Sequence, residues 1–323
     1  LVTGGTGSFG TAFINSILKN DKPKKVIVYS RDELKQYDME RKLKNNKVKF
    51  IIGDIRDLQR LLVSCKGVDT IIHSAALKHV PIAEKNPIEY VKTNILGADN
   101  IIKASITNKV KKVVALSTDK ASSPINLYGT TKLASDKLFV SANFEYPESK
   151  SIFSVVRYGN VINSRGSILP LLKELKENNS KIIPITNKNM TRFWISLNDG
   201  VNFVKNCLNT MKGGEIFIPK LKSIKTTDLA KVILPKSQIK IIGIRSGEKI
   251  HEVLCPKDTN HLTLEYKNYY AIFQDEQSLK SKKTNSLGEI GKKVQISFDY
   301  QSGNKKLLLS SKQIKFFLKK YIN

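Results

Sequence analysis

The chain has 323 residues, 40% of them apolar, and its 55 Lys and Arg against 28 Asp and Glu give a formal net charge of +27. It is long enough to bury a full core in one large domain or two, and no apolar run approaches the roughly 18 residues of a membrane span. Only eight of the basic residues are Arg, and Lys occurs in every segment. Because nucleic-acid recognition relies on Arg, we interpret the charge as compositional bias and expect neither a nucleic-acid nor a membrane partner.

Three cysteines, Cys65, Cys207 and Cys255, lie far apart in the chain. Their spacing fits neither a metal site nor a disulfide framework, so we expect no bound metal and a reducing, cytoplasmic location. We expect no signal peptide, because Leu1–Thr3 leads directly into a glycine-rich turn. Leu1 already lies within the first predicted strand, so we expect the natural N-terminus to precede it.

The first half of the chain alternates strands with helices. Short runs rich in β-branched residues predict strands, and amphipathic stretches between them predict helices. The strands are expected at 26–29, 48–52, 70–72 and 113–116, and the helices at 11–19, 32–45, 58–65 and 90–105. Ser30 and Glu33 have the spacing of a capping box for the second helix. This alternation predicts a doubly wound parallel sheet, a Rossmann domain over residues 1–165.

The pattern loosens from about residue 166. Helices at 169–177 and 197–209 and a strand at 216–218 predict a smaller α/β region that faces the substrate, over residues 166–275. Residues 276–323 form a Lys-rich tail, and its last helix, at 310–321, has apolar residues that we expect to pack on the body of the protein.

A glycine-rich loop follows the first strand. Gly4, Gly7 and Gly10 stand three residues apart between an apolar strand and a helical run. This is the pattern in which the first glycine makes a turn, the second admits a pyrophosphate and the third lets helix and strand pack closely. We therefore predict a dinucleotide site, to which Thr6, Ser8 and Phe9 of the loop also contribute.

The end of the second strand selects the cofactor. An acidic residue there would bind the 2′-hydroxyl of NAD, whereas this chain has Ser30 and Arg31, with Lys35 one turn into the helix. A hydroxyl and two cations favour the 2′-phosphate of NADP, while Asp32 leaves NAD open. Further expected contacts follow the third and fourth strands: Asp54, Ile55, Ser74, Ala75 and Ala76.

The reacting groups are expected at the end of the fifth strand, where Thr118, Asp119 and Lys120 follow Ser117. Tyr128 and Lys132 come next on a helix and share one face, so the lysine can lower the pKa of the phenol. Tyr146 and Lys150 have the same spacing, but Pro147 indicates a loop.

Asp119 and Lys120 distinguish the possible reactions. A simple alcohol dehydrogenase or epimerase needs only Ser or Thr beside the Tyr–Lys pair. An additional acid and amine suit two more proton transfers, as in the dehydration of a sugar. The alternative is that these two residues form an exposed turn.

These motifs resemble the extended short-chain dehydrogenase/reductase superfamily, and within it the inverting UDP-N-acetylglucosamine 4,6-dehydratases that begin pseudaminic acid synthesis. The resemblance is strong from residue 1 to 256 and fades in the tail. It rests on Thr3–Gly10, Tyr29–Lys35, Ala75–Val80, Ser117–Lys132, Val156–Val161, Ser164–Ser167, Met190–Trp194, Gly213–Phe217 and Ile244–Lys249.

The resemblance implies roles for the site residues. Tyr128 would remove the proton of the C4 hydroxyl, which Thr118 also binds, as hydride passes to tightly bound NADP. Lys120 would then take the C5 proton while Asp119 helps to expel the C6 hydroxyl. Hydride would return to C6, and C5 would be reprotonated on its opposite face.

The resemblance also implies how the ligands are held. Lys78 would lie near both cofactor and sugar, and Val161 near the cofactor. The UDP-sugar would be bound by Asn94, Asn160, Arg192, Arg245 and Glu248, with the two arginines at the diphosphate and ribose. For Arg192, which precedes Phe193 and Trp194, stacking at a core edge is the alternative. Relatives commonly form hexamers, so we expect a homo-oligomer.

Three other readings remain. A nucleotide-sugar epimerase would share the glycine loop, Thr118, Tyr128 and Lys132 but would not need Asp119 and Lys120. An inverting dehydratase that supplies another capsule sugar would look the same in sequence. A dinucleotide sensor or scaffold without activity would not need the intact acid–base groups.

Overall fold

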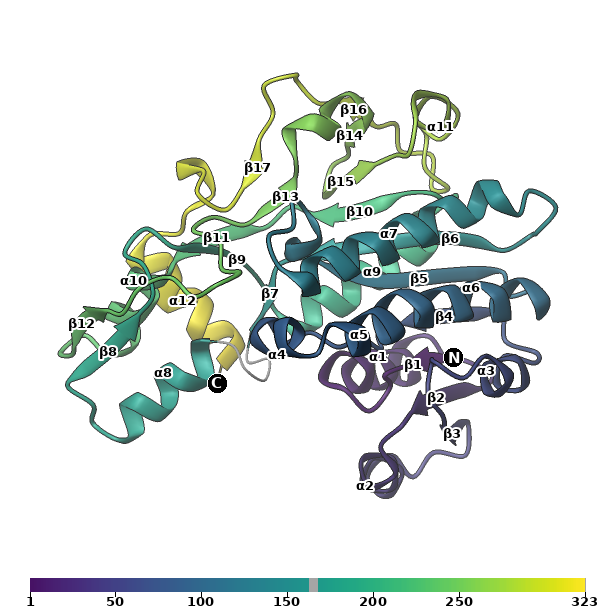
Figure 1. Ribbon diagram of the computed structural model, residues 1–323, viewed down its shortest axis with the longest axis horizontal. Coiled ribbons are helices and arrows are strands. Elements are labelled where there is room, and N and C mark those ends of the chain that lie inside the picture. Colours follow the sequence, from purple (N-terminus) through teal and green to yellow (C-terminus); the bar gives the residue numbers. More distant parts are fainter. Residues whose placement is uncertain (163–167, 323) are drawn as a thin grey trace.

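The computed structural model describes residues 1–162 and 168–322. Over this part of the chain the main sheet has ten strands in the order β16-β14-β15-β10-β6-β5-β4-β1-β2-β3 (Figure 1). The strands from β3 to β10 in this order are parallel, and β15, β14 and β16 extend that edge in antiparallel fashion. Helical crossovers join the first parallel strands, so the predicted doubly wound α/β fold is confirmed.

The strands of the main sheet are short, and smaller sheets lie beside it. The main sheet contains β1 (Val2–Thr3), β2 (Val26–Ser30), β3 (Val48–Ile52), β4 (Thr70–His73), β5 (Lys112–Thr118), β6 (Ile152–Tyr158), β10 (Ile216–Pro219), β14 (Thr263–Glu265), β15 (Tyr269–Ile272) and β16 (Lys292–Lys293). The smaller sheets contain β7 (Asn160–Val161), β8 (Ile182–Ile185), β9 (Thr191–Ile195), β11 (Lys222–Lys225), β12 (Gln238–Ile241), β13 (Val253–Cys255) and β17 (Tyr300–Gln301).

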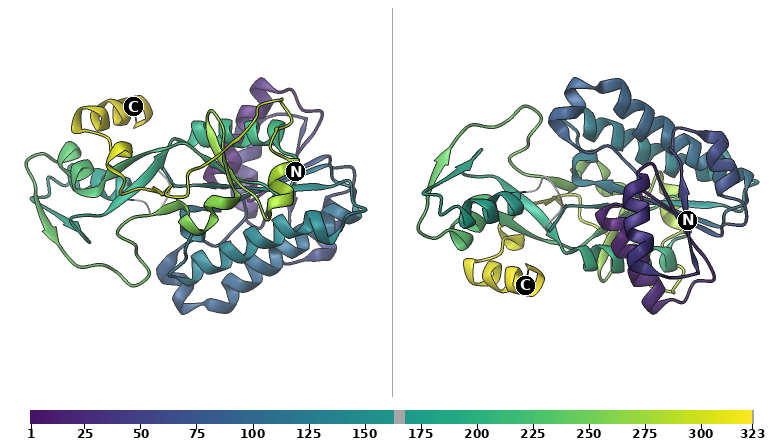
Figure 2. Two further views of the ribbon diagram at one scale, coloured as in Figure 1. Left: turned by 90° about the horizontal axis from the view of Figure 1, so that it is seen from above. Right: turned by 90° about the horizontal axis from the view of Figure 1, so that it is seen from below.

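Helices cover the main sheet on both faces (Figures 1 and 2). The helices of the first half are α1 (Ser8–Asn20), α2 (Glu33–Leu43), α3 (Leu58–Ser64), α4 (Val80–Lys85), α5 (Pro87–Tyr90), η1 (Val91–Leu96), α6 (Gly97–Thr107), η2 (Asp119–Ala121) and α7 (Leu127–Glu145). Those of the second half are α8 (Ile168–Glu177), α9 (Leu197–Thr210), α10 (Thr226–Ile233), η3 (Lys257–Leu262), α11 (Glu276–Ser281), η4 (Lys305–Leu307) and α12 (Ser311–Ile322). Helices α3, α6 and α7 pack together in one layer, and α1 packs with α9 in another.

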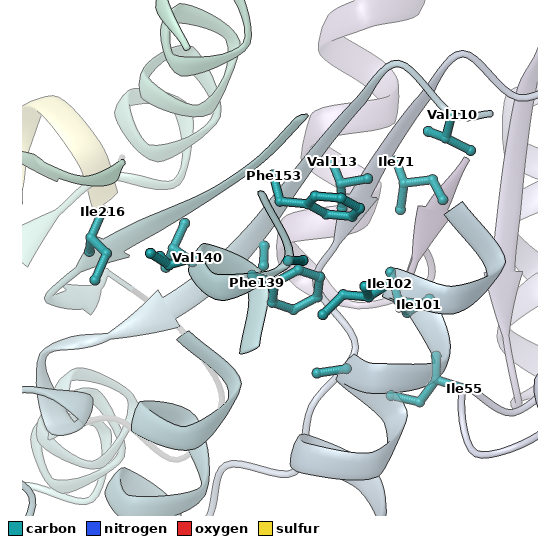
Figure 3. Packing of buried hydrophobic residues seen from close by; sticks show 14 of the residues in the cluster. Ile55, Ile71, Ile101, Ile102, Val110, Val113, Phe139, Val140, Phe153 and Ile216 are labelled. Atoms are coloured by element: carbon teal, nitrogen blue, oxygen red, sulfur yellow. The ribbon is translucent and has the colours of Figure 1, made fainter. Parts of the chain in front are cut away.

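Two apolar clusters fix these layers to the sheet. One lies beneath α3, α6 and α7, where Phe139 of α7 packs against Phe153 of β6 at a ring distance of 6.4 Å (Figure 3). The other includes Phe13 and Ile14 of α1 and Val204 of α9. Because the strands bury both faces, runs of Val and Ile are what such a sheet requires.

A third apolar cluster holds together the smaller lobe, which is built from α8, α10, α12 and short strands (Figure 2). Its fully buried members from helices are Leu169, Leu172, Leu229, Ala230 and Ile314. Strands from the second half of the chain also enter the main sheet, since β10 pairs with β6 and β15 pairs with β10. The chain after residue 166 is therefore shared between the lobe and the far edge of the sheet.

One local prediction was wrong. Asp32, and not Ser30, caps α2, because its carboxylate accepts the N–H of Lys35 at 3.0 Å while Ser30 is still the last residue of β2. The predicted helix at 90–105 is confirmed, and it contains a π-helical turn, η1, between α5 and α6. Such turns often occur at functional sites.

The described residues contain neither a membrane-spanning helix nor a cluster of metal-binding side chains. Within residues 1–162 and 168–322, none of the helices combines the length and apolar character needed to cross a membrane. In the same part of the chain, no grouping of three or more His, Cys, Asp or Glu side chains is suited to a metal ion.

Candidate active site

The glycine-rich loop forms a tight cradle between β1 and α1. Gly4 has a φ of +63°, and a Cβ there would lie 2.9 Å from the backbone nitrogen of Ala75. A Cβ at Gly10 would lie 2.6 Å from the Cα of Gly5. At Gly7, in contrast, a Cβ would meet only the Gly4 carbonyl, at 3.1 Å. The first and third glycines are thus required by packing, and the second leaves room above the loop.

Helix α1 begins at this loop with an N-terminus that favours an anion. Its N-cap is Gly7, no side chain caps it, and its first turn contains no acidic residue. The backbone N–H groups of the first turn lack partners within the helix, and the helix dipole adds a partial positive charge. This arrangement suits a pyrophosphate. Phe9 is turned to the other side of the loop, where its ring stacks on Phe13 and Tyr158 at 5.9 and 6.5 Å.

The end of β2 presents Ser30 to this loop. The Ser30 hydroxyl accepts hydrogen bonds from Thr6 Oγ1 at 3.2 Å and from Gln36 Nε2 at 3.0 Å. Arg31 is half exposed and lies 3.6 Å from the carboxylate of Asp54, and Lys35 is paired with Asp32. Acidic neighbours therefore already offset part of the charge of both cations.

The segments after β3 and β4 approach the same cradle to different degrees. Ser74 donates its hydroxyl proton to the Thr3 carbonyl at 2.6 Å, and the Ala75 N–H reaches Thr3 Oγ1 at 3.3 Å. Asp54 holds Arg56 at 2.8 Å, and Ile55 is buried in the core. The side chain of Ile55 packs beneath α6, so only the backbone of Ile55 can face a ligand in the cradle.

The reacting groups lie where β5 ends and η2 begins. Thr118 caps η2, and α7 starts after Asn126, whose side chain accepts the N–H of Gly129 at 2.8 Å. A Cβ at Gly129 would lie 2.2 Å from the carbonyl oxygen of Lys120. Glycine at this position is therefore what lets η2 rest on α7 and brings Tyr128 next to the end of β5.

Asp119 and Lys120 form an ion pair and not an exposed turn, with Asp119 buried and the side chain of Lys120 25% exposed. Asp119 is 1% exposed, and its Oδ1 accepts from Lys120 Nζ at 3.1 Å and from Thr118 Oγ1 at 3.0 Å. The other carboxylate oxygen, Oδ2, is buried without a hydrogen-bond partner. The phenol of Tyr128 lies close to Thr118, which acts to lower its pKa. An acid, an amine, an alcohol and a phenol therefore meet at one point, which is what several proton transfers on one substrate require.

The local charges set the protonation of this group. Burial, the strongest influence, raises the pKa of Asp119; Lys120 opposes that rise, and the carboxylate of Glu252 reinforces it. Burial alone would lower the pKa of Lys120, but Asp119 and Glu252 outweigh it and raise the pKa above its usual range. A carboxylic acid with a raised pKa is suited to act as a proton donor.

The prediction that Lys132 lowers the pKa of Tyr128 was wrong, because the pKa of this buried phenol is raised. Burial raises the pKa of Tyr128 to about 12, and the Thr118 hydrogen bond and Lys120 offset only part of this shift. Burial also lowers the pKa of Lys132, which Asp136 one turn further along α7 opposes. Desolvation of the phenol exceeds the effect of the nearby amines.

A family model described as "Polysaccharide biosynthesis protein" matches residues 1–274 of this chain. The chain belongs to this family. Two relatives from Campylobacter jejuni, strains 81-176 and NCTC 11168, are 53% identical over 97% of this chain and 95% of theirs, and both are named UDP-N-acetylglucosamine 4,6-dehydratase (inverting). A Rickettsia bellii relative named UDP-glucose 4-epimerase is 42% identical over 95% of this chain and 92% of its own.

Solved structures agree with the fold of this family member. The structure of Pen from Bacillus thuringiensis has a TM-score of 0.87 at 33% identity and covers 99% of this chain and 96% of its own. DesIV from Streptomyces venezuelae, a dTDP-glucose 4,6-dehydratase with NAD bound, has a TM-score of 0.70 at 22% identity over 77% of this chain and 85% of its own. At that identity the likeness shows the fold alone. The resemblance expected from the motifs thus extends over the whole chain.

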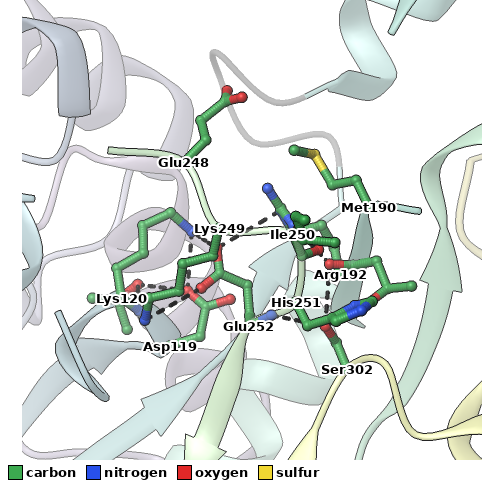
Figure 4. Close-up of polar contacts among 12 residues, drawn as sticks. Asp119, Lys120, Met190, Arg192, Glu248, Lys249, Ile250, His251, Glu252 and Ser302 are labelled. Carbon is green, nitrogen blue, oxygen red and sulfur yellow. Dashed lines mark hydrogen bonds and ion pairs between the residues drawn. The ribbon is translucent and has the colours of Figure 1, made fainter. Parts of the chain in front are cut away.

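A second carboxylate in the site of this polysaccharide biosynthesis protein was missed. Glu252 is 1% exposed, and its Oε1 lies 3.2 Å from Lys120 Nζ and 3.7 Å from Arg192 Nε (Figure 4). Lys249, three residues earlier, donates to the Ser122 carbonyl at 2.6 Å. Lys249 is the last residue of the motif at 244–249, so an acid three residues beyond this lysine was the signal available.

The loop that carries the motif at 244–249 is tied to the site, with its outer residues on the surface. Asn126 donates to the Gly247 carbonyl at 2.8 Å. Arg245 is 62% exposed, and its guanidinium lies 3.9 Å from Glu248, whose carboxylate points away from the ion-pair cluster (Figure 4). Arg192 in contrast lies inside, only 12% exposed, which places the two predicted diphosphate ligands at different depths.

The other expected ligand-binding residues occupy varied positions. Asn94 is buried, accepts the Leu77 N–H at 2.9 Å and donates to the Leu77 carbonyl and to Thr131, both at 3.0 Å. Asn160 pairs in β-register with Trp194, next to Val161, which pairs with Ile195. Ala76 and Lys78 are exposed. The motif at 164–167 lies outside the described residues.

Proposed function

We propose that the protein is an inverting UDP-N-acetylglucosamine 4,6-dehydratase, a hydro-lyase. The observation that carries this proposal is the ion pair of the buried Asp119 with the largely covered Lys120, within hydrogen-bond reach of Thr118 and beside Tyr128. An epimerase that only oxidises and reduces C4 has no use for a buried acid and amine beyond the tyrosine. The two Campylobacter relatives at 53% identity support the same activity by their names.

The cofactor that we propose is tightly bound NADP. The glycine cradle and the uncapped N-terminus of α1 fit a pyrophosphate, and the hydroxyl of Ser30 with Arg31 and Lys35 fits a 2′-phosphate. When bound, NADP would supply the oxidant for C4 and, once reduced, the reductant for C6. Lys132 would hold the nicotinamide ribose, and the backbone of Ala75 lies close against Gly4 of the loop.

The proton transfers follow from the protein groups. Tyr128 takes the proton of the C4 hydroxyl, with Thr118 as its hydrogen-bond partner, and C4 becomes a ketone. The ketone acidifies C5, and Lys120 takes the C5 proton after passing its own proton to Asp119, which accepts from its Nζ at 3.1 Å. Asp119 donates its proton to the C6 hydroxyl, which leaves as water. The product is a 2-acetamido-2,6-dideoxy-4-hexulose sugar nucleotide, with C5 inverted because its new proton arrives from the opposite face.

The substrate-facing region, residues 166–275, would hold the UDP group. Arg192 from β9 is a buried, permanently charged fork, which suits a diphosphate. Asn160 lies on the strand beside it, and the loop of Arg245 and Glu248 lies over the same side of the acid–base group. Three buried, unpaired cysteine thiols agree with a cytoplasmic enzyme, and we propose a homo-oligomer as its assembly.

A nucleotide-sugar 4-epimerase is the second candidate. One observation favours it: the Rickettsia bellii relative at 42% identity bears that name. The two candidates share Tyr128, Lys132 and the cofactor cradle. They differ in whether C5 and C6 react.

Proton NMR separates them. The purified protein is incubated with UDP-N-acetylglucosamine in D2O, without added cofactor. We expect a new C6 methyl signal, deuterium at C5 and the coupling pattern of the inverted sugar. Formation of UDP-N-acetylgalactosamine without a methyl signal would instead identify the epimerase. A methyl signal with the C5 configuration retained would support dehydration and contradict inversion at C5.

A further inference from the structure

One carboxylate connects three cations at the centre of the site. Glu252 reaches Lys120 and Arg192 through Oε1, at 3.2 and 3.7 Å, and Lys249 lies 3.9 Å from Oε2 (Figure 4). Oε2 itself is buried without a hydrogen-bond partner. A buried carboxylate needs such compensation, because an isolated charge in the interior is strongly unfavourable.

The three cations depend on Glu252 to different degrees. Arg192 also donates from NH1 to the carbonyl oxygens of Thr191 at 2.7 Å and Ile250 at 3.2 Å. Lys249 also donates to the Ser122 carbonyl. The ion-pair partners of Lys120 in the described part of the chain are the carboxylates of Asp119 and Glu252. Lys120 is therefore the cation whose position depends most on Glu252.

The backbone of Glu252 is fixed by the C-terminal tail. The Glu252 N–H is accepted by Ser302 Oγ at 2.9 Å, and the same hydroxyl group contacts Thr191 Oγ1 at 2.7 Å. Strand β13, directly after Glu252, pairs with β17 of the tail. A segment far along the sequence thus sets where this carboxylate points.

We propose that Glu252 is a positioning residue for Lys120: it holds the Nζ atom towards the substrate and stabilises the ammonium that forms when Lys120 takes the C5 proton. This inference rests on the proposed function. Asp119 cannot do the same, because it must be protonated, and hence neutral, at the moment when it donates to the C6 hydroxyl. Glu252 is then the anion that remains beside Lys120, as an orienting carboxylate does for a general base.

The charges around Glu252 keep it ionised. Burial alone would raise its pKa, but Lys120, Arg192 and Lys249 outweigh burial and lower the pKa of Glu252. The negative charge on Glu252 in turn supports a raised pKa for Asp119. Glu252 thus favours the protonated form of Asp119 and, once Lys120 has taken the C5 proton, the ammonium that results.

The test is Glu252→Gln, which keeps the shape of the side chain and removes its charge. We expect kcat for UDP-N-acetylglucosamine to fall by about a hundredfold, with KM changed less than about threefold, because Arg192 keeps its two carbonyl anchors. Substrate deuterated at C5 should show a larger isotope effect on kcat than with the unaltered protein. Substrate deuterated at C4 should show a smaller one, since removal of the C5 proton becomes the slow step.

Two further variants complete the design. Glu252→Asp retains the charge, and we expect it to keep more activity than Glu252→Gln. If Glu252→Gln does not fold, the isotope effects are measured on Glu252→Asp instead. Glu215→Gln removes another buried carboxylate, which bonds Ser154 and the Lys212 N–H, and we expect neither isotope effect to change. The positioning role of Glu252 would be overturned if kcat fell in Glu252→Gln while both isotope effects stayed unchanged, or if only KM changed. Neither result would affect the proposed function. Absence of a C6 methyl product from the unaltered protein would overturn the proposed function, and this inference with it.

Discussion

Single glycines in the cofactor loop serve two different physical purposes. At Gly10 an added Cβ would lie 2.6 Å from the Cα of Gly5, a contact that only backbone movement can relieve. At Gly7 it would lie 3.1 Å from the Gly4 carbonyl, which needs a much smaller shift. We expect Gly10→Ala to lower the free energy of unfolding in urea by about 1–3 kcal/mol. We expect Gly7→Ala to fold but to bind NADP at least tenfold more weakly in calorimetry, because the methyl group would occupy the space of the pyrophosphate.

Gly200→Ala in α9 is the matched control, since its nearest neighbour would be Ile195 at 3.9 Å. Alanine should be tolerated there or be stabilising. Unimpaired NADP binding by Gly7→Ala would show that the loop does not hold a pyrophosphate.

Arg31 is the residue whose charge should select between the two dinucleotides. Its guanidinium is half exposed, 3.6 Å from Asp54, so the ion pair is weak and leaves the cation available to a phosphate. We expect Arg31→Gln to raise the Kd for NADP by about tenfold and to leave that for NAD unchanged, as measured by calorimetry at fixed salt. Arg56→Gln, which removes another partner of the same carboxylate, should leave the ratio of the two Kd values unaltered. An equal loss of affinity for both dinucleotides in Arg31→Gln would contradict this assignment.

At the scale of elements, the π-helical turn η1 connects two parts of the site. It places Asn94 so that this residue bonds both backbone groups of Leu77 and the Thr131 hydroxyl on α7. Residues 74–78, after β4, are thereby fixed to the helix that carries Tyr128. We expect Asn94→Ala to lower the free energy of unfolding by about 2–3 kcal/mol, because it leaves buried polar groups without partners.

The control for this element is Asn100→Ala on α6, which loses one hydrogen bond, to the Ile55 carbonyl at 3.0 Å. It should cost about 1 kcal/mol. A double-mutant cycle of Asn94→Ala with Thr131→Val should give a coupling of about 1 kcal/mol. Additive losses in that cycle would show that the bond between η1 and α7 contributes nothing to stability.

The elements that could be predicted from the sequence are those encoded locally. The glycine loop, strands β2 to β5 and the Thr118–Lys120 turn follow from residues adjacent in the chain, and the structure contains them. Glu252 could not be placed in this way, because β13 and Ser302 of the tail bring it to Lys120. The pKa of Tyr128 was misjudged for a related reason: the helix spacing shows its amine neighbour, while the degree of burial depends on the whole fold.

At the scale of the whole molecule, one buried histidine links stability to pH. His73 at the end of β4 is fully buried, bonded to Thr3 at 2.8 Å, and burial, with Lys132, lowers its pKa to about 3. Between pH 6.5 and 3 the unfolded chain therefore takes up a proton at this position that the folded protein does not. Stability from His73 is complete above pH 6.5 and decreases as the pH falls, by up to about 1.4 kcal/mol per pH unit.

Urea unfolding at pH 7, 6, 5 and 4 should show this slope in the unaltered protein, and His73→Gln should flatten it. His261→Gln, at an exposed position, should retain the full slope. An unchanged slope in His73→Gln would contradict this account, because it would mean that His73 takes up its proton over the same pH range in the folded and the unfolded protein.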